Sequence, residues 1–466
     1  MVTSTLARVQ TDPRPLERYL AAFEAFEKAE AEPAPPWLRA LRTSGISYLA
    51  QLGLPTSDLE DWRFTNPALL AQFPFSPAIS PLPSRLALSE IKHFFPDGLE
   101  THRLVFVDGH FSPELSAIGS VPPGVTIGSL ADVLREQPSL IESHLGRAAR
   151  HETNAFAALN TAFLQDGAFL HLPPHQNLET PVHLLFLTKT PGAVNQPRNL
   201  FVAGPHSRLR VIEDYVSLGE AATFTNAVTE IFAGDNARLE HLKIQRENAA
   251  SLHVATIECR QQRDSSVLTH SLSVGARLAR HNIHLRLESQ GCVSVLNGLY
   301  LADGERLVDH HTIADHLAPH CASHEFLHGI LGGRARGVFN GRIFVHLDAQ
   351  KTDARQTNRN LLLSDDATIN STPQLEIHAD DVKCTHGATV GQLDDEALFY
   401  LRSRGIGENL ARQMLIHAFA SDIINRITIE PARAWLEKVL AERLSDPPAT
   451  LPARTKPTPL GETSHV

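Results

Sequence analysis

The chain has 466 residues, of which 42% are hydrophobic and 20% are charged, and its formal net charge is −10. This length exceeds what one ordinary core needs and predicts about two to three structural units. The acidic balance argues against non-specific binding to nucleic acid, which depends on excess Lys and Arg, and no run of about 18 apolar residues predicts a membrane span.

Residues 1–165 are predicted to form a mixed region of helices and short strands. Apolar side chains recur at spacings of three and four within 15–30 and within 37–52, so each segment should form a helix. Prolines at 33, 35 and 36 separate the two helices. The apolar run 104–107, followed by Asp108 and Gly109, predicts a strand closed by a tight turn.

Residues 166–392 carry short apolar alternations punctuated by Gly, Asn and Asp, with little helical periodicity. In 283–287, for example, apolar and polar residues alternate, which is typical of a half-buried strand. Three similar triplets open strand-like runs 30 and 39 residues apart: Ser207-Arg208-Leu209, Ala237-Arg238-Leu239 and Ala276-Arg277-Leu278. Repeated short strands predict a β-solenoid or a β-sandwich, and the pattern alone leaves both open.

Residues 393–445 are predicted to form a domain of three helices. Asp394 is a suitable N-cap, and Gly405 suits the left-handed position that follows a helix. A second helix should cover 408–427 and a third 431–444. Residues 446–466 are rich in Pro and Thr and are predicted to be disordered.

Several catalytic motifs are absent from the sequence. It contains no Gly-x-x-x-x-Gly-Lys-Ser/Thr phosphate loop, no Gly-x-Gly-x-x-Gly, no Gly-x-Ser-x-Gly and no His-Glu-x-x-His. Any ATP hydrolysis linked to this function must therefore come from another chain.

Histidine is abundant, and His310, His311 and four further histidines fall within 310–328. The four, spaced four residues apart, are His316, His320, His324 and His328. On a helix they would form a ladder able to bind a transition metal, which is the basis of a metalloenzyme alternative. Pro319 and the glycines that follow argue against such a helix, so we favour histidines that bond to the backbone or face solvent.

The four cysteines are dispersed, at Cys259, Cys292, Cys321 and Cys384, and none forms a Cys-x-x-Cys pair. This usage is typical of a reducing compartment. Residues 1–20 lack the apolar stretch of a signal peptide. We therefore expect a cytoplasmic protein.

Cys384 and His386 are the strongest candidates for chemistry. In an extended segment, residues two apart point the same way, so a thiol and an imidazole would lie side by side. Both suit soft or borderline metals and sulfur transfer. Two ligands do not complete a zinc site. The pair is either part of a larger site, with Asp380 and Asp381 as further candidates, or a buried Cys beside a hydrogen-bonded His.

A collinear set of segments in the C-terminal half carries a family resemblance. The segments are Lys351-Thr352-Asp353, Asn358 with Asn360-Leu361-Leu362-Leu363, Pro373-Gln374-Leu375-Glu376-Ile377, 379–391 around Cys384, and 399–406. Upstream matches are Asp303-Gly304, Asp309-His310, 336–341 and 60–66. Together they resemble the SufB/SufD family of iron-sulfur cluster assembly proteins. The stretch Cys-Thr-His-Gly-Ala at 384–388, where SufB-like chains usually read Cys-Glu-His-Glu-Ala, favours the SufD branch.

The resemblance implies a mainly β fold: a right-handed parallel β-helix core between an N-terminal helical or mixed region and a C-terminal α-helical domain. It also implies a non-catalytic scaffold subunit that works with SufB and the ABC-type ATPase SufC, and indirectly with a cysteine desulfurase. An isolated chain could form a homodimer instead. A SufB-type scaffold that accepts sulfur itself is the alternative within the family.

By the same resemblance, His386 and Cys384 lie at the interface with SufB where clusters are built. His386 would contribute to iron binding jointly with the partner, and iron or a nascent cluster would be held there only transiently, with no tightly bound cofactor. The helices from Asp394 to Leu444 would dock the ATPase.

Overall fold

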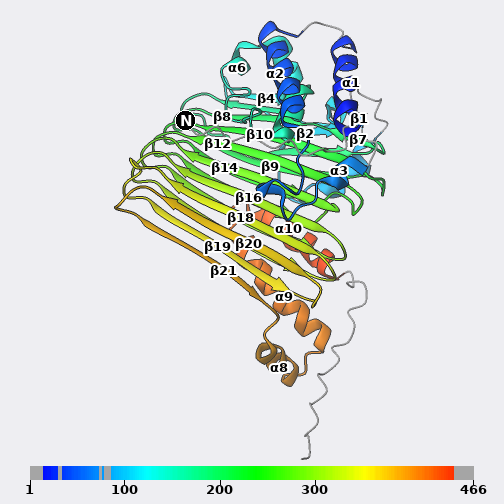
Figure 1. Cartoon of the computed structure of the whole chain (residues 1–466), viewed down its shortest axis with the longest axis vertical. Helices are drawn as coiled ribbons and strands as arrows, with labels where there is room; N and C mark the ends of the chain where they lie inside the picture. Colours follow the sequence, from blue (N-terminus) through cyan, green and yellow to red (C-terminus); the bar gives the residue numbers. More distant parts are fainter. Residues whose placement is uncertain (1–13, 30–33, 73–75, 78–85, 446–466) are drawn as a thin grey trace, which may run out of the picture.

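The computed structural model describes residues 14–29, 34–72, 76–77 and 86–445 (Figure 1). Its centre is a β-solenoid of about eight turns, with helices at both ends. Within each sheet, the strands that belong to successive turns of the solenoid pair in parallel. The structure therefore decides between the two architectures that the sequence left open, and the mainly β fold implied by the resemblance is confirmed.

The N-terminal region combines helices with the first strands of both sheets. Its helices are α1 (Arg14–Ala29), α2 (Pro36–Leu52), α3 (Ala68–Gln72), α4 (Leu88–Ile91), α5 (Leu130–Glu136), α6 (Ser139–Glu142) and α7 (Ala155–Ala162), with short 3-10 turns η1 (Glu60–Trp62), η2 (Lys92–Phe94) and η3 (Pro113–Leu115). Its strands are β1 (Ser76–Pro77), β2 (His102–Val107), β3 (His110–Phe111) and β4 (Thr126–Ser129).

Sequence patterns in this region predicted its main elements. The helices expected over 15–30 and 37–52 are confirmed as α1 and α2, with Pro36 as the first residue of α2. Pro33 lies outside the described residues. Asp108 and Gly109, both at positive φ, form the predicted turn between β2 and β3. Because β2 also pairs with β6 (Val182–Thr188), this hairpin extends the solenoid.

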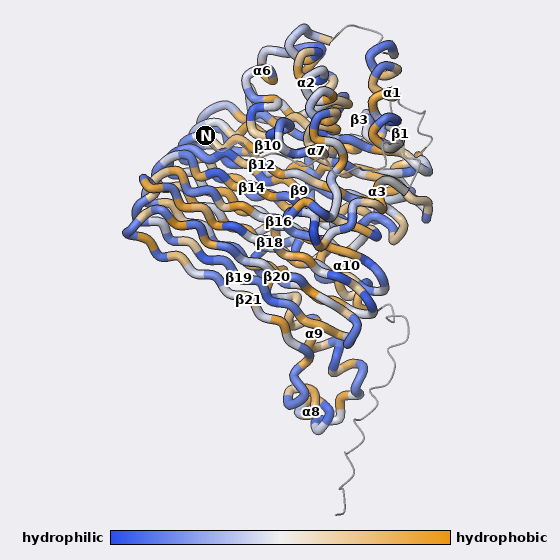
Figure 2. The backbone as a smooth tube through the Cα atoms, in the orientation of Figure 1, coloured by the Kyte–Doolittle hydropathy of each residue, from blue (hydrophilic) through white to orange (hydrophobic). Residues whose placement is uncertain are grey.

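The solenoid consists of two sheets. One contains β5 (Ala168–Leu172), β7 (Ala193–Asn195), β8 (Arg198–Ala203), β10 (Phe224–Ala233), β12 (Leu252–Gln261), β14 (Leu278–Leu287), β16 (Leu307–His316), β18 (Arg336–Val345) and β20 (Thr368–Ile377). The other contains β6, β9 (Arg208–Ser217), β11 (Arg238–Gln245), β13 (Ser266–Ser273), β15 (Val293–Ala302), β17 (Ala322–Leu331), β19 (Asp353–Leu362) and β21 (Lys383–Gly391). Figure 2 shows hydrophobic and hydrophilic stretches alternating along many of these strands.

One corner of the solenoid explains the Gly, Asn and Asp punctuation of the sequence. Successive turns each place one residue there in the left-handed conformation: His175, His206, Asn236, Asp264, Gly291, His320 and Lys351. The backbone N–H of each donates to a carbonyl of the following turn, as from His206 to Asp235 at 2.7 Å. Gly, Asn, Asp and His tolerate positive φ better than other residues, so this corner selects them.

The repeated triplets reflect this stacking only in part. Arg208 and Arg238 are direct partners on β9 and β11, so the first two triplets occupy equivalent positions on neighbouring turns. The third triplet precedes and opens β14, which belongs to the other sheet. The spacing of 30 residues therefore reflects the repeat of the solenoid, whereas the spacing of 39 residues joins strands of different sheets and is a coincidence.

The C-terminal helices are α8 (Asp395–Ser403), α9 (Glu408–Ile424) and α10 (Glu430–Ser445). The Asp394 side chain accepts the N–H groups of Glu396 and Ala397, and Gly405 has φ of 85°, as the capping pattern predicted. α9 ends before the predicted position 427. The apolar side of α9 packs into one cluster with α10 and with β15 and β17. Residues 446–466 lie outside the described part of the chain.

Candidate functional site

Cys384 and His386 both lie on β21, the last strand of its sheet. Their direct partners on β19 are Ala354 and Gln356. Ala354 and Gln356 are buried, so the two candidate residues continue inward-facing columns of the solenoid. No further turn covers them in the part of the chain that the structure describes: Cys384 is half-buried and His386 is exposed. The thiol and the imidazole thus lie on one face, at the uncovered end of the solenoid interior.

The surroundings of Cys384 favour its neutral thiol. Partial burial raises the pKa of Cys384, and the negative charge of Asp353 raises it further. The side chain packs against an apolar cluster that includes Ile343 and Ala354. Because the thiolate is the nucleophile and the metal ligand, this chain alone does not activate Cys384.

A column of buried polar side chains runs inward from His386. Gln356, its partner on β19, donates through Nε2 to Glu325 Oε2 at 2.8 Å, and Thr312 donates to the same oxygen at 2.9 Å. Burial raises the pKa of Glu325 to about 7, and these two hydrogen bonds oppose the shift. Glu325 Oε1 and Gln356 Oε1 have no hydrogen-bond partner in the described part of the chain. The column therefore contains a carboxyl that can exchange a proton near neutral pH.

Sequence reasoning missed Gln356 and Glu325 as neighbours of His386. Glu325 and Gln356 are 31 residues apart in sequence and direct partners on β17 and β19. His386 follows after about one more turn of the solenoid. The length of one turn was the signal that could have linked all three, but it requires the strand register.

The end of the solenoid that carries β20 and β21, called here the open end, leaves two strands with an unpaired edge among the described residues. They are 10 and 9 residues long. Ser371 and Leu375 of β20, whose partners on β18 face inward, are only partly covered there. An uncovered edge offers backbone N–H and C=O groups to another chain. The open end is therefore an unfinished surface with Cys384 and His386 upon it.

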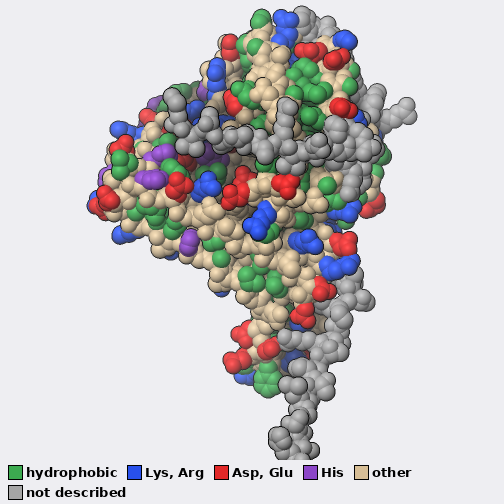
Figure 3. Space-filling model, in the orientation of Figure 1, with side chains coloured by type: hydrophobic (Ala, Val, Ile, Leu, Met, Phe, Trp, Pro, Cys, Tyr) green, Lys and Arg blue, Asp and Glu red, His purple; other side chains and the backbone are tan. Residues whose placement is uncertain are grey.

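A second exposed surface lies on the C-terminal helices. Phe399 and Tyr400 of α8 are 74% and 57% exposed, and Leu410 and Met414 of α9 are 55% and 44% exposed. Figure 3 shows hydrophobic and acidic side chains on this projecting part. These four residues, called the α8 surface, are large, mostly apolar side chains on two consecutive helices. Grouped exposed apolar residues of this kind mark a protein contact.

Comparison with known proteins places these features in a family. The SufBD core domain of the SUF iron-sulfur cluster assembly system matches residues 186–419, and the SufBD N-terminal region matches residues 14–184. The chain belongs to the SufBD family.

Its relatives include members of the SufD type. An iron-sulfur cluster assembly SufBD family protein of Synechocystis is 34% identical over 86% of this chain and 90% of its own. The iron-sulfur cluster assembly protein SufD of Escherichia coli is 33% identical over 86% of this chain and 91% of its own. SufD of Bacillus subtilis is 25% identical over 92% of this chain and 98% of its own. This SufBD protein is therefore an iron-sulfur cluster assembly protein with SufD homologues.

The histidines of 310–328 do not form the ladder of the metalloenzyme alternative. They lie on β16, on β17 and in the turn between them, so a helical spacing of four has no meaning there. Burial lowers the pKa of His310 to about 3 and that of His316 to about 4. In the described residues of this SufBD protein, no group of three or more His, Cys, Asp and Glu side chains converges as a metal site.

The N-terminal segment 60–66 contacts a buried ion pair of the solenoid, which Arg280 and Asp309 form. Arg280 lies over the Trp62 ring at 3.9 Å and donates to the Asp61 carbonyl oxygen at 2.6 Å. The same guanidinium bonds to Asp309 Oδ2 at 2.8 Å, and Thr65 donates to that oxygen as well. Two matching segments of the family resemblance, 60–66 and Asp309-His310, thus form one structural contact.

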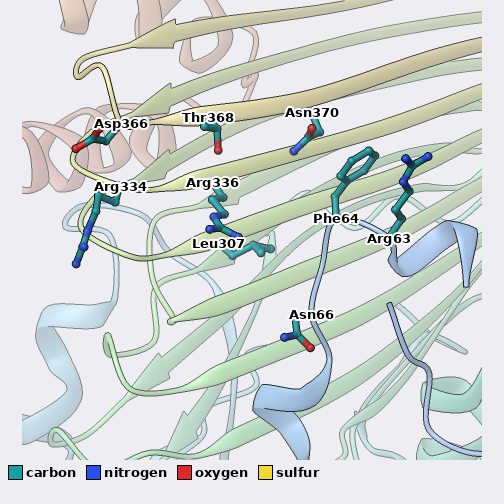
Figure 4. A pocket seen from close by; sticks show the side chains of 9 residues that line it. All are labelled: Arg63, Phe64, Asn66, Leu307, Arg334, Arg336, Asp366, Thr368 and Asn370. Atoms are coloured by element: carbon teal, nitrogen blue, oxygen red, sulfur yellow. The ribbon is translucent and has the colours of Figure 1, made fainter. Parts of the chain in front are cut away.

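A groove of about 660 Å³ lies between this segment and the starts of β16, β18 and β20 (Figure 4). Arg63, Phe64 and Asn66 line it on one side, and Arg334 and Arg336 line it on the other. Cys384 and His386 are not among its lining residues, because they lie on the other sheet. The groove and the candidate site are therefore separate features.

Membrane insertion through a helix finds no support in the described residues. None of the helices there combines the length and the apolar character that a membrane span requires.

Proposed function

We propose that this chain is a SufD-type subunit of a complex with SufB and the ATPase SufC, and that its open end forms the cluster-building interface with SufB. The observation that carries the proposal is the position of Cys384 and His386. They are inward-facing residues of an interior that no turn within the described residues closes. A second solenoid docked on β20 and β21 would pair both free edges and cover the two side chains.

Iron and sulfide are the cargo of this interface. His386 contributes an imidazole, and Cys384 contributes a thiol whose raised pKa calls for a nearby cation or metal before it ionises. Two ligands are too few for a finished site, so the partner supplies the rest. The cluster is held transiently, and the chain has no tightly bound cofactor. The neutral thiol also counts against the SufB-type alternative, in which the cysteine itself accepts sulfur.

The α8 surface is the docking site for SufC. The sequence has no phosphate loop, so nucleotide hydrolysis belongs to the partner, and this chain acts as a non-catalytic scaffold. α9 links the α8 surface to the solenoid, because it carries Leu410 and Met414 at one end and packs into one cluster with β15 and β17 through Ile416 and Ile423. Sulfur reaches the complex from a cysteine desulfurase. We place the complex in the cytoplasm, and we expect the isolated chain to form a homodimer through the open end.

Replacing His386 tests the cluster-building role. In a co-expressed complex, we expect His386→Ala to abolish cluster formation while the complex remains assembled, because His386 is exposed at an edge. The readout is the iron and sulfide content and the visible absorption of the purified complex. His93→Ala is the matched control, since His93 is also exposed but lies in the N-terminal region, on neither strand of the open end. A full cluster yield from the His386 variant would refute the role.

A point substitution tests ATPase docking more cleanly than a truncation. Deleting 394–444 would remove α9 and most of α10 and would uncover the solenoid residues packed against them, such as Leu299 and Ile330. Phe399→Glu instead changes one side chain that is 74% exposed. We expect it to reduce co-purification of SufC at least tenfold, and Leu52→Glu on α2, at a side chain that is 42% exposed, to leave it unchanged. Equal SufC recovery from both variants would place the docking site elsewhere.

A further inference from the structure

Two thiols lie one above the other on neighbouring turns of the solenoid. Cys292 directly precedes β15 and Cys321 directly precedes β17, and the first residues of these strands, Val293 and Ala322, are partners. The Ala322 N–H donates to the Cys292 carbonyl oxygen at 2.9 Å, so the parallel ladder includes the cysteines. Neighbouring strands lie about 4.7–4.9 Å apart. That spacing falls within the range of about 4.4–6.8 Å between the Cα atoms of a disulfide.

The two cysteine side chains belong to one small buried cluster, together with Leu287 and Ala318. The Ser289 carbonyl oxygen lies 2.9 Å from Cys292 Sγ and 3.2 Å from Cys321 Sγ, so both sulfurs occupy the same small space. The closeness of the two sulfurs lowers the pKa of Cys292 and raises the pKa of Cys321. Cys292 is therefore the thiol of the pair that ionises first, and Cys321 is the neighbouring thiol that can react with it next.

Packing alone does not require cysteine at these positions. The equivalent positions on other turns, each directly before a strand of the same sheet, are Ser207, Ala237, Ser265 and Thr352. Small side chains of several kinds therefore fill this column. The cysteines are buried, but each follows a residue of the left-handed corner, Gly291 or His320, and His320 is exposed.

We propose that Cys292 and Cys321 are a redox modification site that forms a reversible disulfide with a hydroperoxide and joins two turns of the solenoid covalently. This site is separate from the open end and goes beyond the scaffold role. The Cys292 thiolate attacks the peroxide oxygen, which gives a sulfenic acid and releases water or an alcohol once the leaving oxygen takes up a proton. The Cys321 sulfur then attacks the sulfenic sulfur, and a second molecule of water leaves as the S–S bond forms. A dithiol reductant reverses the oxidation by exchange.

Peptide mapping of the full-length protein after treatment with hydrogen peroxide tests the site. We expect a peptide pair joined through Cys292 and Cys321, lighter by two hydrogen atoms than the reduced pair and separated again by dithiothreitol. We also expect the melting temperature of the oxidised protein to rise by a few degrees, because the bond restricts the unfolded chain. Cys321→Ser should remove both effects, and it should fold, since Ser265 occupies the equivalent position on another turn.

Cys259→Ser is the matched control, because Cys259 is buried in the main apolar cluster rather than in this column. It should retain the linked peptide and the shift in melting temperature. Oxidation of Cys384 in the same digest shows that the peroxide was active. If Cys384 is oxidised while Cys292 and Cys321 stay reduced, or if Cys292 pairs with another cysteine, the proposal is wrong.

Discussion

The middle of the solenoid and its open end both place carboxyl groups in the interior, yet these groups behave in opposite ways. In the middle, Glu213 bonds to His241 at 2.9 Å and accepts from the Tyr215 hydroxyl at 2.6 Å. These contacts and the charge of Lys243 lower the pKa of Glu213 although it is fully buried. Near the open end, Glu325 has only the neutral donors Gln356 and Thr312, and burial raises its pKa to about 7.

The comparison shows where this chain is complete and where it is not. Glu247, also in the middle, bonds to His253 at 2.9 Å and accepts from Thr225 and Gln245, and its pKa is lowered too. The middle carboxyls have cationic or polar partners supplied by neighbouring turns. Among the described residues, Gln356 and Glu325 keep unpartnered oxygens, one and two turns respectively below the uncovered His386. Glu213 and Glu247 in the middle are thus compensated by their partners, whereas Glu325 near the proposed interface is not; other polar atoms of the middle, such as His241 Nδ1 and Asn297 Oδ1, lack hydrogen-bond partners among the described residues as well.

The largest expected effect comes from breaking the finished middle. Glu213→Ala would leave His241, Tyr215 and Lys243 without their carboxylate, and removal of one partner of a buried ion pair costs about 3–5 kcal/mol. We expect the free energy of unfolding in denaturant to fall by this amount. Glu305→Ala, which removes an exposed pair with Arg334, should cost no more than about 1 kcal/mol. Similar losses in the two variants would show that the interior pairing is not what stabilises the middle.

Glu325 should make the protein less stable as the pH rises, whereas a carboxyl with a lowered pKa, such as Glu213, has the opposite effect. The folded protein holds this proton up to about pH 7, whereas an unfolded Glu releases it near pH 4.5. Between these values the folded state binds more protons than the unfolded state, so stability is lost as the pH rises, by about 3 kcal/mol in all. Glu325→Gln removes the carboxyl, so the variant should be more stable than the parent at pH 8 and similar to it near pH 4.

Glu247→Gln sharpens the same comparison, because the folded pKa of Glu247 is lowered rather than raised. Its carboxylate stabilises the fold above the unfolded pKa, so this variant should be less stable than the parent at pH 8. Unfolding curves of the parent and of both variants at several pH values measure the difference. If both substitutions changed stability in the same direction at pH 8, the contrast between middle and open end would fail.

Local patterns in the sequence predicted the elements but not their assembly. Asp394 and Gly405 predicted the limits of α8, because helix caps depend on nearby residues only. Alternation at 283–287 predicted a strand, but strands of a sandwich alternate in the same way, so the solenoid came only from the family resemblance. The facing of Cys384 and His386 followed from an extended backbone. Gln356 and Glu325 did not follow, since their approach depends on the register of two earlier turns.

The smallest expected change in stability belongs to the substitution of His386, and it distinguishes the open end from the middle of the solenoid most clearly. His386 is exposed and lies on an edge strand, so His386→Ala should change the free energy of unfolding by no more than about 0.5 kcal/mol. The inward-facing His241, at the corresponding place on β11, bonds to Glu213 in the buried interior, so His241→Ala should cost several times more. Denaturant unfolding of the isolated chain measures both. A large loss with His386→Ala would mean that this histidine supports the fold, and the absence of clusters in the variant complex would then say nothing about iron. A negligible loss, together with an assembled complex that carries no cluster, assigns the histidine to the chemistry of the interface.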